Sequence, residues 1–215
     1  MIKKISSREL FYAEIALAVA IILQVFVWKT SHHFFGSQYV IILAEIVLIV
    51  ILALIGRIKT MHGRAVYKSA AIAFLALISV GNISSLVIVL NVLIVGSSAI
   101  TGPELLTAAI AIFLTNIIVF SLWYWEIDSP GLTRQRWSQS DQDFLFVQQE
   151  RRSEFIGWTP QYLDYLYLSV TNAINFASAD TKPITRNAKF LMGAQALISV
   201  FTLALVVARS VSILG

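Results

Sequence analysis

Long apolar segments separated by short polar ones make up most of the chain, and they predict helices that cross a membrane. A bilayer core of about 30 Å requires about 20 mostly apolar helical residues. Four segments meet this length clearly, at 10–28, 38–56, 69–95 and 104–125. A fifth apolar segment covers 188–213. The pattern therefore predicts an all-α, polytopic integral membrane protein.

The stretch 161–181 is also apolar, but polar residues interrupt it, namely Asp164, Asn172, Asn175 and Asp180. Two interpretations stay open. The stretch is either a re-entrant half-helix, which gives five transmembrane helices plus a pore loop, or a sixth transmembrane helix. We accordingly divide the chain into a four-helix transmembrane region at 1–125, a cytoplasmic or interfacial loop at 126–160, and a C-terminal unit at 161–215.

The loop 126–160 is the only sizeable polar stretch of the sequence. It contains the turn pair Pro130-Gly131, a run of mixed charges and an apolar island at 144–146. It is too short and too poor in core residues to fold alone. We expect an irregular, partly helical segment at the membrane surface.

Composition supports the membrane class and excludes several kinds of chemistry. Of 215 residues, 58% are hydrophobic and 13% charged, with a mean hydropathy of +0.78, whereas soluble domains carry about 25% charged residues. The chain has no cysteine, and its three histidines lack carboxylate partners at metal-site spacing. No paired-carboxylate, nucleophile–base or phosphate-loop motif occurs. We therefore expect no enzyme activity, no cofactor and no metal site.

The distribution of basic residues predicts the orientation in the membrane. Lysines and arginines concentrate before the first segment, in the loop 57–68 and in the loop 126–160, whereas the opposite loops hold only Lys29. Because basic loops stay in the cytoplasm, the N-terminus is predicted to be cytoplasmic. This bias explains the net charge of +4 without nucleic acid as a partner. We expect a multi-pass protein of the bacterial inner membrane.

Two acidic residues fall inside predicted spans, and ionisable groups there are functional candidates by default. Glu14 lies about five residues inside the first span, which is close enough to reach the interface. Glu45 is deeper, seven residues past Gln38. Its carboxyl group would be protonated, paired with a polar group of another helix, or exposed to a wet cavity.

The C-terminal unit has the pattern of a re-entrant loop. A short amphipathic helix is expected from Pro160 to about Asn172, with Thr159 as its N-cap. A polar stretch of small residues, a proline-containing turn at 181–185 and a long apolar helix follow. Non-helical backbone at membrane depth persists only where protein or water surrounds it.

This unit resembles the pore-helix, filter and inner-helix unit of the two-transmembrane potassium channels, with the pattern S-V-x-T-x-T-x-V-G-Y-G-D-x-x-P-x-T. Ser169-Val170 open the pattern, 175–180 stand in place of T-V-G-Y-G-D, and Pro183 and Thr185 follow without gaps. The likeness covers about 55 residues. It implies filter-like or pore positions at Thr171, Asn172, Asn175, Phe176, Ala177, Ser178, Ala179 and Asp180. The whole chain also resembles a family of uncharacterised bacterial polytopic membrane proteins.

Three departures from the channel pattern argue against potassium selectivity. A potassium filter aims successive backbone carbonyls at the ion, and its glycines take conformations that residues with a Cβ resist. Ala177 and Ala179 stand at those glycine positions, and Ser178 replaces the tyrosine.

The sequence therefore favours a channel-like, homo-oligomeric protein that binds or conducts a small inorganic cation through a non-potassium filter. A non-conducting accessory or interaction protein and a small-solute transporter are the alternatives. A pore lined by one half-helix per chain requires several chains around an axis, whereas the alternatives work as monomers. The lipid bilayer is the first partner in every case.

The predicted orientation is tested by cysteine labelling, because the natural chain has no cysteine. Single cysteines at Ser6 and at Thr60 are expected to resist a membrane-impermeant thiol reagent in intact cells, since both positions lie on the cytoplasmic side. Both should react once the cells are permeabilised, which is the control for accessibility. Labelling of both positions in intact cells would reverse the orientation.

Overall fold

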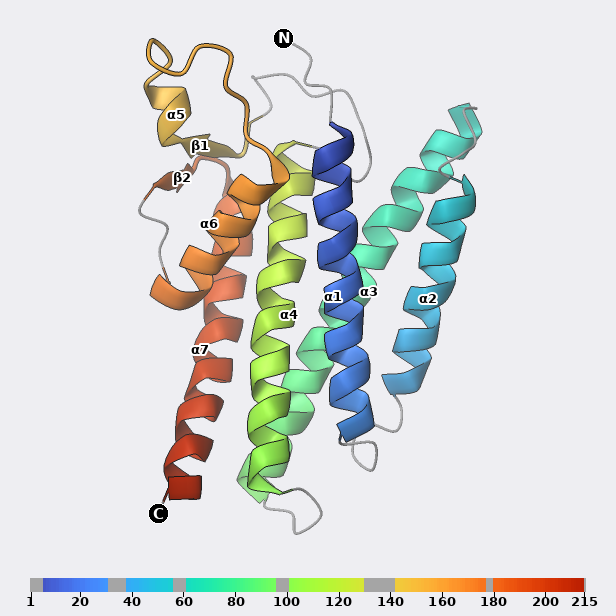
Figure 1. Ribbon diagram of the computed structural model, residues 1–215, viewed down its shortest axis with the longest axis vertical. Helices are drawn as coiled ribbons and strands as arrows, with labels where there is room; N and C mark the ends of the chain where they lie inside the picture. Colours follow the sequence, from blue (N-terminus) through green and yellow to red (C-terminus); the bar gives the residue numbers. More distant parts are fainter. Residues whose placement is uncertain are drawn as a thin grey trace. The chain divides into compact units, whose positions relative to one another are not determined.

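A computed structural model describes residues 6–30, 38–55, 61–95, 101–129, 142–176 and 180–214. Most of them are helical (Figure 1), in α1 Ser7–Thr30, α2 Gln38–Ile55, α3 Met61–Val95, α4 Gly102–Asp128, α5 Val147–Glu150, α6 Tyr162–Asn175 and α7 Arg186–Leu214. Two short strands, β1 Phe144–Phe146 and β2 Thr181–Pro183, complete the described elements.

Four of these helices are long and apolar enough to cross a membrane, over Arg8–Lys29, Ser69–Ile94, Gly102–Asp128 and Arg186–Ala208. They coincide with four of the predicted spans, and α2 forms an 18-residue helix over the range of the remaining one. The prediction of a helical membrane protein is confirmed at this level.

Two helix starts differ from the expectation. Helix α3 begins at Met61, so most of the predicted loop 57–68 is helical. Helix α6 begins at Tyr162, with Gln161 in place of Thr159 as the N-cap. The reason is local, because the backbone N–H of Gln161 donates to the carboxylate of Asp164 at 2.7 Å. An acidic side chain at the third helical position satisfies an otherwise free donor at the helix start.

The chain forms two compact units, which are described separately. The first unit comprises the described residues within 1–17 and 117–197. The second unit comprises those within 18–116 and 198–215.

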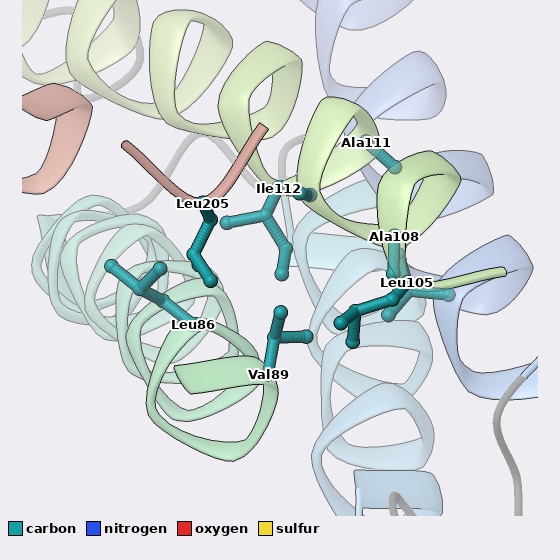
Figure 2. Packing of buried hydrophobic residues seen from close by; sticks show 9 residues of the cluster. Leu86, Val89, Leu105, Ala108, Ala111, Ile112 and Leu205 are labelled. Atoms are coloured by element: carbon teal, nitrogen blue, oxygen red, sulfur yellow. The ribbon is translucent and has the colours of Figure 1, made fainter. Parts of the chain in front are cut away.

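The second unit has an apolar core in which α3, α4 and α7 meet. Figure 2 shows that large side chains from the three helices point toward one another, namely those of Leu86, Val89, Leu105, Ile112 and Leu205. Small buried residues of α4, among them Ala108 and Ala111, line the same core. Small side chains allow membrane helices to approach closely, and close packing is a main source of their association.

The first unit contains a two-stranded antiparallel ribbon in which Phe144 pairs with Pro183 and Phe146 with Thr181. The loop 126–160 was expected to be irregular and partly helical; its described part contains the short helix α5, and the strand β1 was not expected. Phe144 and Phe146 are buried, whereas Leu145 between them is only partly buried. Alternate burial is the pattern of a strand. The rings of Phe144 and Tyr124 meet edge to face, with centroids 5.2 Å apart.

The core of the second unit predicts that two isoleucines of α4 contribute differently to the stability of the fold. Ile112 is 1% exposed and Ile110 is 44% exposed. Ile112→Ala is expected to lower the free energy of unfolding by roughly 2 kcal/mol or more, because it leaves a cavity. Ile110→Ala is the matched control and should have a much smaller effect. Thermal unfolding of the purified variants in detergent measures the difference, and equal loss in both would refute the assigned core.

Candidate functional site

Helix α6 buries one face against the C-terminal part of α4 and the N-terminal part of α7 (Figure 1). The buried residues include Tyr162, Tyr165, Ser169 and Asn172. Their spacing of three and four residues places them on one side of the helix. Each of them carries a polar group, so the contact between the helices is built from hydrogen bonds as well as packing.

Asp128, the last residue of α4, joins three elements of the first unit. Its Oδ1 accepts the backbone N–H groups of Asp143 at 2.5 Å and Phe144 at 2.9 Å. Its Oδ2 accepts the hydroxyl of Tyr165 at 2.5 Å. Asp128 is fully buried. A buried carboxyl group that receives several donors is a strong tie, and it fixes the start of β1 and the first turns of α6 to the end of α4.

Burial raises the pKa of two phenols of α6, a helix too short to be a candidate span. Removal from water raises the pKa of Tyr165 well above its ordinary value, and the adjacent Asp128 raises it further. Burial also raises the pKa of Tyr162 to about 12, although its hydroxyl lies 3.0 Å from the Ser121 hydroxyl. Both phenols therefore remain protonated throughout the physiological pH range.

An amide network joins the middle of α6 to α7. The Asn172 side chain donates to Gln195 Oε1 at 2.8 Å and to the Met192 carbonyl at 3.0 Å. Gln195 in turn donates to the Ser169 hydroxyl at 2.7 Å. The Tyr124 hydroxyl of α4 also donates to Gln195 Oε1, at 2.5 Å. Asn172, a predicted pore position, is thus buried and holds α6 against α7.

The other predicted pore positions that the structure describes lie at the end of α6. The Thr171 hydroxyl donates to the Tyr167 carbonyl of its own helix at 3.0 Å. Phe176 ends the helix in a left-handed conformation, with φ of 56°. Asn175, Phe176 and Asp180 are exposed, and Asp180 accepts the Tyr167 hydroxyl at 3.2 Å. The predicted positions Ala177, Ser178 and Ala179 lie outside the described residues.

After this stretch the chain returns to the place where α6 starts. Strand β2 pairs with β1. The Ile184 N–H then donates to the Asp143 carbonyl at 2.9 Å, and the Thr185 hydroxyl bonds to the Asp143 side chain. Since Asp128 binds both Asp143 and the first turns of α6, the two ends of 162–185 are tied to the same short region of the chain.

The two predicted intramembrane acids have different environments. Glu14 is exposed on α1 in the first unit. Glu45 is completely buried on α2 in the second unit.

Sequence reasoning missed Asp128 and Tyr165 as a pair. The signal for α6 was present in the three- and four-residue spacing of its polar and aromatic residues. The partner of Tyr165 had no such signal, because it lies 37 residues earlier in the chain.

Within the described residues, no group of three or more His, Cys, Asp or Glu residues is placed to hold a metal ion. Comparison with protein-family models, curated proteins and solved structures finds no match to this chain.

The hydrogen bond from Tyr165 to Asp128 predicts that removal of a tyrosine hydroxyl lowers stability more at Tyr165 than at Tyr167. Tyr165→Phe leaves a buried carboxyl oxygen without its donor, so it is expected to lower the free energy of unfolding by about 2 kcal/mol. Tyr167→Phe removes only an exposed hydrogen bond and is the matched control, with an expected effect below about 0.5 kcal/mol. Thermal unfolding of both purified variants provides the measurement. Equal stability of Tyr165→Phe and the natural chain would show that the tie contributes little.

Proposed function

We propose that this chain is a channel-like membrane protein in which 162–185 enters the bilayer from one side and returns to that same side. The observation that carries the proposal is the connection of both ends of this segment to Asp128 and Asp143. Helix α6 has 14 residues, which gives a length of about 21 Å. A bilayer core of about 30 Å is too thick for such a helix to cross.

The polarity of α6 favours a cation at the turn of this loop. The C-terminal end of a helix carries partial negative charge, because its last carbonyls lack partners within the helix. That end leads directly to Asn175 and Phe176, and the acidic side chain of Asp180 follows. Carbonyl dipoles and a carboxylate together attract cations, as rings of such groups do in channels.

The composition of the loop argues for a filter that does not select potassium. Ala177 and Ala179 occupy the positions of the filter glycines, and Ser178 that of the tyrosine. Restoring glycines at both alanines should loosen this stretch without creating potassium selectivity, because Ser178 and Asn175 also differ.

A channel of this kind requires several copies of the chain around one axis. In a single chain the outer face of α6 leaves apolar side chains exposed, including Leu163, Tyr167, Ile174 and Phe176. Such a face suits contact with another copy or with lipid. A homo-oligomer in the cell membrane, with the N-terminus in the cytoplasm, is part of the proposal.

A second candidate is a non-conducting accessory protein that binds a partner through the loop 126–160. Ile156, in the described part of that loop, is 91% exposed and its neighbour Phe155 is 41% exposed. Two exposed apolar side chains on a polar loop suit insertion into a membrane surface or a partner protein. In this alternative, α6 serves only to hold the loop in place.

Asp180→Asn tests the channel proposal. The purified protein in liposomes, with a cation-sensitive dye inside, is expected to pass monovalent cations. The substitution should lower this flux severalfold at low ionic strength and less at high ionic strength, because salt screens the lost charge. Glu154→Gln is the matched control, since Glu154 is an exposed acid paired with Arg151 at 2.8 Å, and its flux should not change.

The channel proposal is contradicted by a particular chain path and oligomeric state. An experimental structure in nanodiscs that shows a monomer with 161–181 as one continuous crossing helix would eliminate the channel proposal. Absence of flux from a monomer whose loop binds a second protein would favour the accessory function instead.

A further inference from the structure

The second unit contains a buried carboxyl group that its protein surroundings leave unsatisfied. Glu45 lies near the middle of α2 and is completely buried. In the part of the chain that the structure describes, neither of its carboxyl oxygens has a hydrogen-bond partner. An ionised carboxylate without a partner is very unfavourable in apolar surroundings.

A glycine brings this carboxyl group together with an amide of another helix. A Cβ at Gly81 of α3 would lie 3.2 Å from Gln24 Nε2 and 3.4 Å from Glu45 Oε1. The side chains from α1 and α2 therefore meet over the bare backbone of α3. Gln24 Nε2 donates to the Ile78 carbonyl at 3.2 Å, which orients the amide.

Several buried polar atoms of this unit lack partners among the described residues. They include the acceptors Gln24 Oε1 and Asn82 Oδ1 besides both oxygens of Glu45, and the donor Trp28 Nε1, four residues after Gln24 on α1. Gln24 and Asn82 are 7% and 3% exposed. Asn82 follows Gly81 and lies four residues after Ile78, so it belongs to the same face of α3. The Gln24 amide beside the carboxyl group already donates to the Ile78 carbonyl, so a proton or a cation would satisfy the oxygens that remain.

We infer that Glu45 and Gln24, with Asn82 on the adjacent helix face, form a buried binding site for one small monovalent cation. The ligand is a proton bound to the carboxyl group or a sodium ion that replaces it. A protonated Glu45 can donate to a nearby amide oxygen, and a sodium ion is coordinated by carboxylate and amide oxygens. The site is independent of the proposed channel loop.

No charged side chain described in the second unit neutralises Glu45. Helix α2 carries no charged residue besides Glu45, and α3 carries none from Ser69 to Val95, a stretch that Arg64 and Lys68 precede. The remaining charged side chains described in this unit are Lys29 near the end of α1 and Glu104 in the first turn of α4. Neither bonds to the Glu45 carboxyl oxygens. Among the side chains that the structure describes in this unit, none supplies a compensating charge.

Infrared spectroscopy of the purified full-length protein tests the site. The carbonyl band of a protonated carboxyl group is recorded between about pH 4 and about pH 10, in sodium chloride and in choline chloride. The natural chain should show a band that titrates, and Glu45→Gln should abolish it. Glu14→Gln is the matched control, because Glu14 is exposed on α1, and it should leave this band unchanged.

The two salts identify the ligand. An equal pH midpoint of the carboxyl band in both salts indicates a proton site. A lower pH midpoint in sodium chloride than in choline chloride indicates that Na⁺ competes with the proton. Either result supports the inference. Gly81→Ala keeps Glu45 but crowds it, so it should shift the midpoint even if Glu45→Gln folds poorly. A Glu45 band that does not change with pH or with sodium would show a permanently protonated structural acid and overturn the site.

Discussion

A polar group in apolar surroundings must find a partner, and the first unit depends on how Asp128 meets this requirement. Its carboxyl group receives two backbone donors from the start of β1 and one phenol from α6. The strand has only three residues, too few to hold its place alone. The tie at Asp128 therefore determines where the ribbon and the start of α6 lie, and the return of the chain through β2 follows from that position.

The same requirement has the opposite outcome in the second unit. Around Tyr124, Asn172 and Gln195 of the first unit the donors and acceptors pair with one another, so this network is closed. Around Glu45 both carboxyl oxygens and Gln24 Oε1 have no hydrogen-bond partner among the described residues. A closed network stabilises a fold, whereas an incomplete one leaves groups that a ligand can satisfy.

Sequence predicted the long helices because the length of an apolar segment is a local property. It did not predict the strand at Phe144, since three residues carry too little pattern to distinguish a strand from a turn. Nor did it predict the pairing of Asp128 with Tyr165, because the chain between them gives no local sign of their contact. Asn172 shows a third limit. Its position in a channel-like pattern suggested a pore, whereas its burial against Gln195 depends on tertiary packing.

The burial of Asn172 changes its part in the proposed channel. An asparagine whose side chain bonds to Gln195 and to the Met192 carbonyl does not contact a passing ion. It instead sets the angle between α6 and α7, and hence the direction of the negative end of the α6 dipole. The exposed groups beyond it, Asn175 and Asp180, are the ones available to a cation. Within the channel proposal, selectivity therefore belongs to the residues after the helix, and the buried amides fix the geometry in which they act.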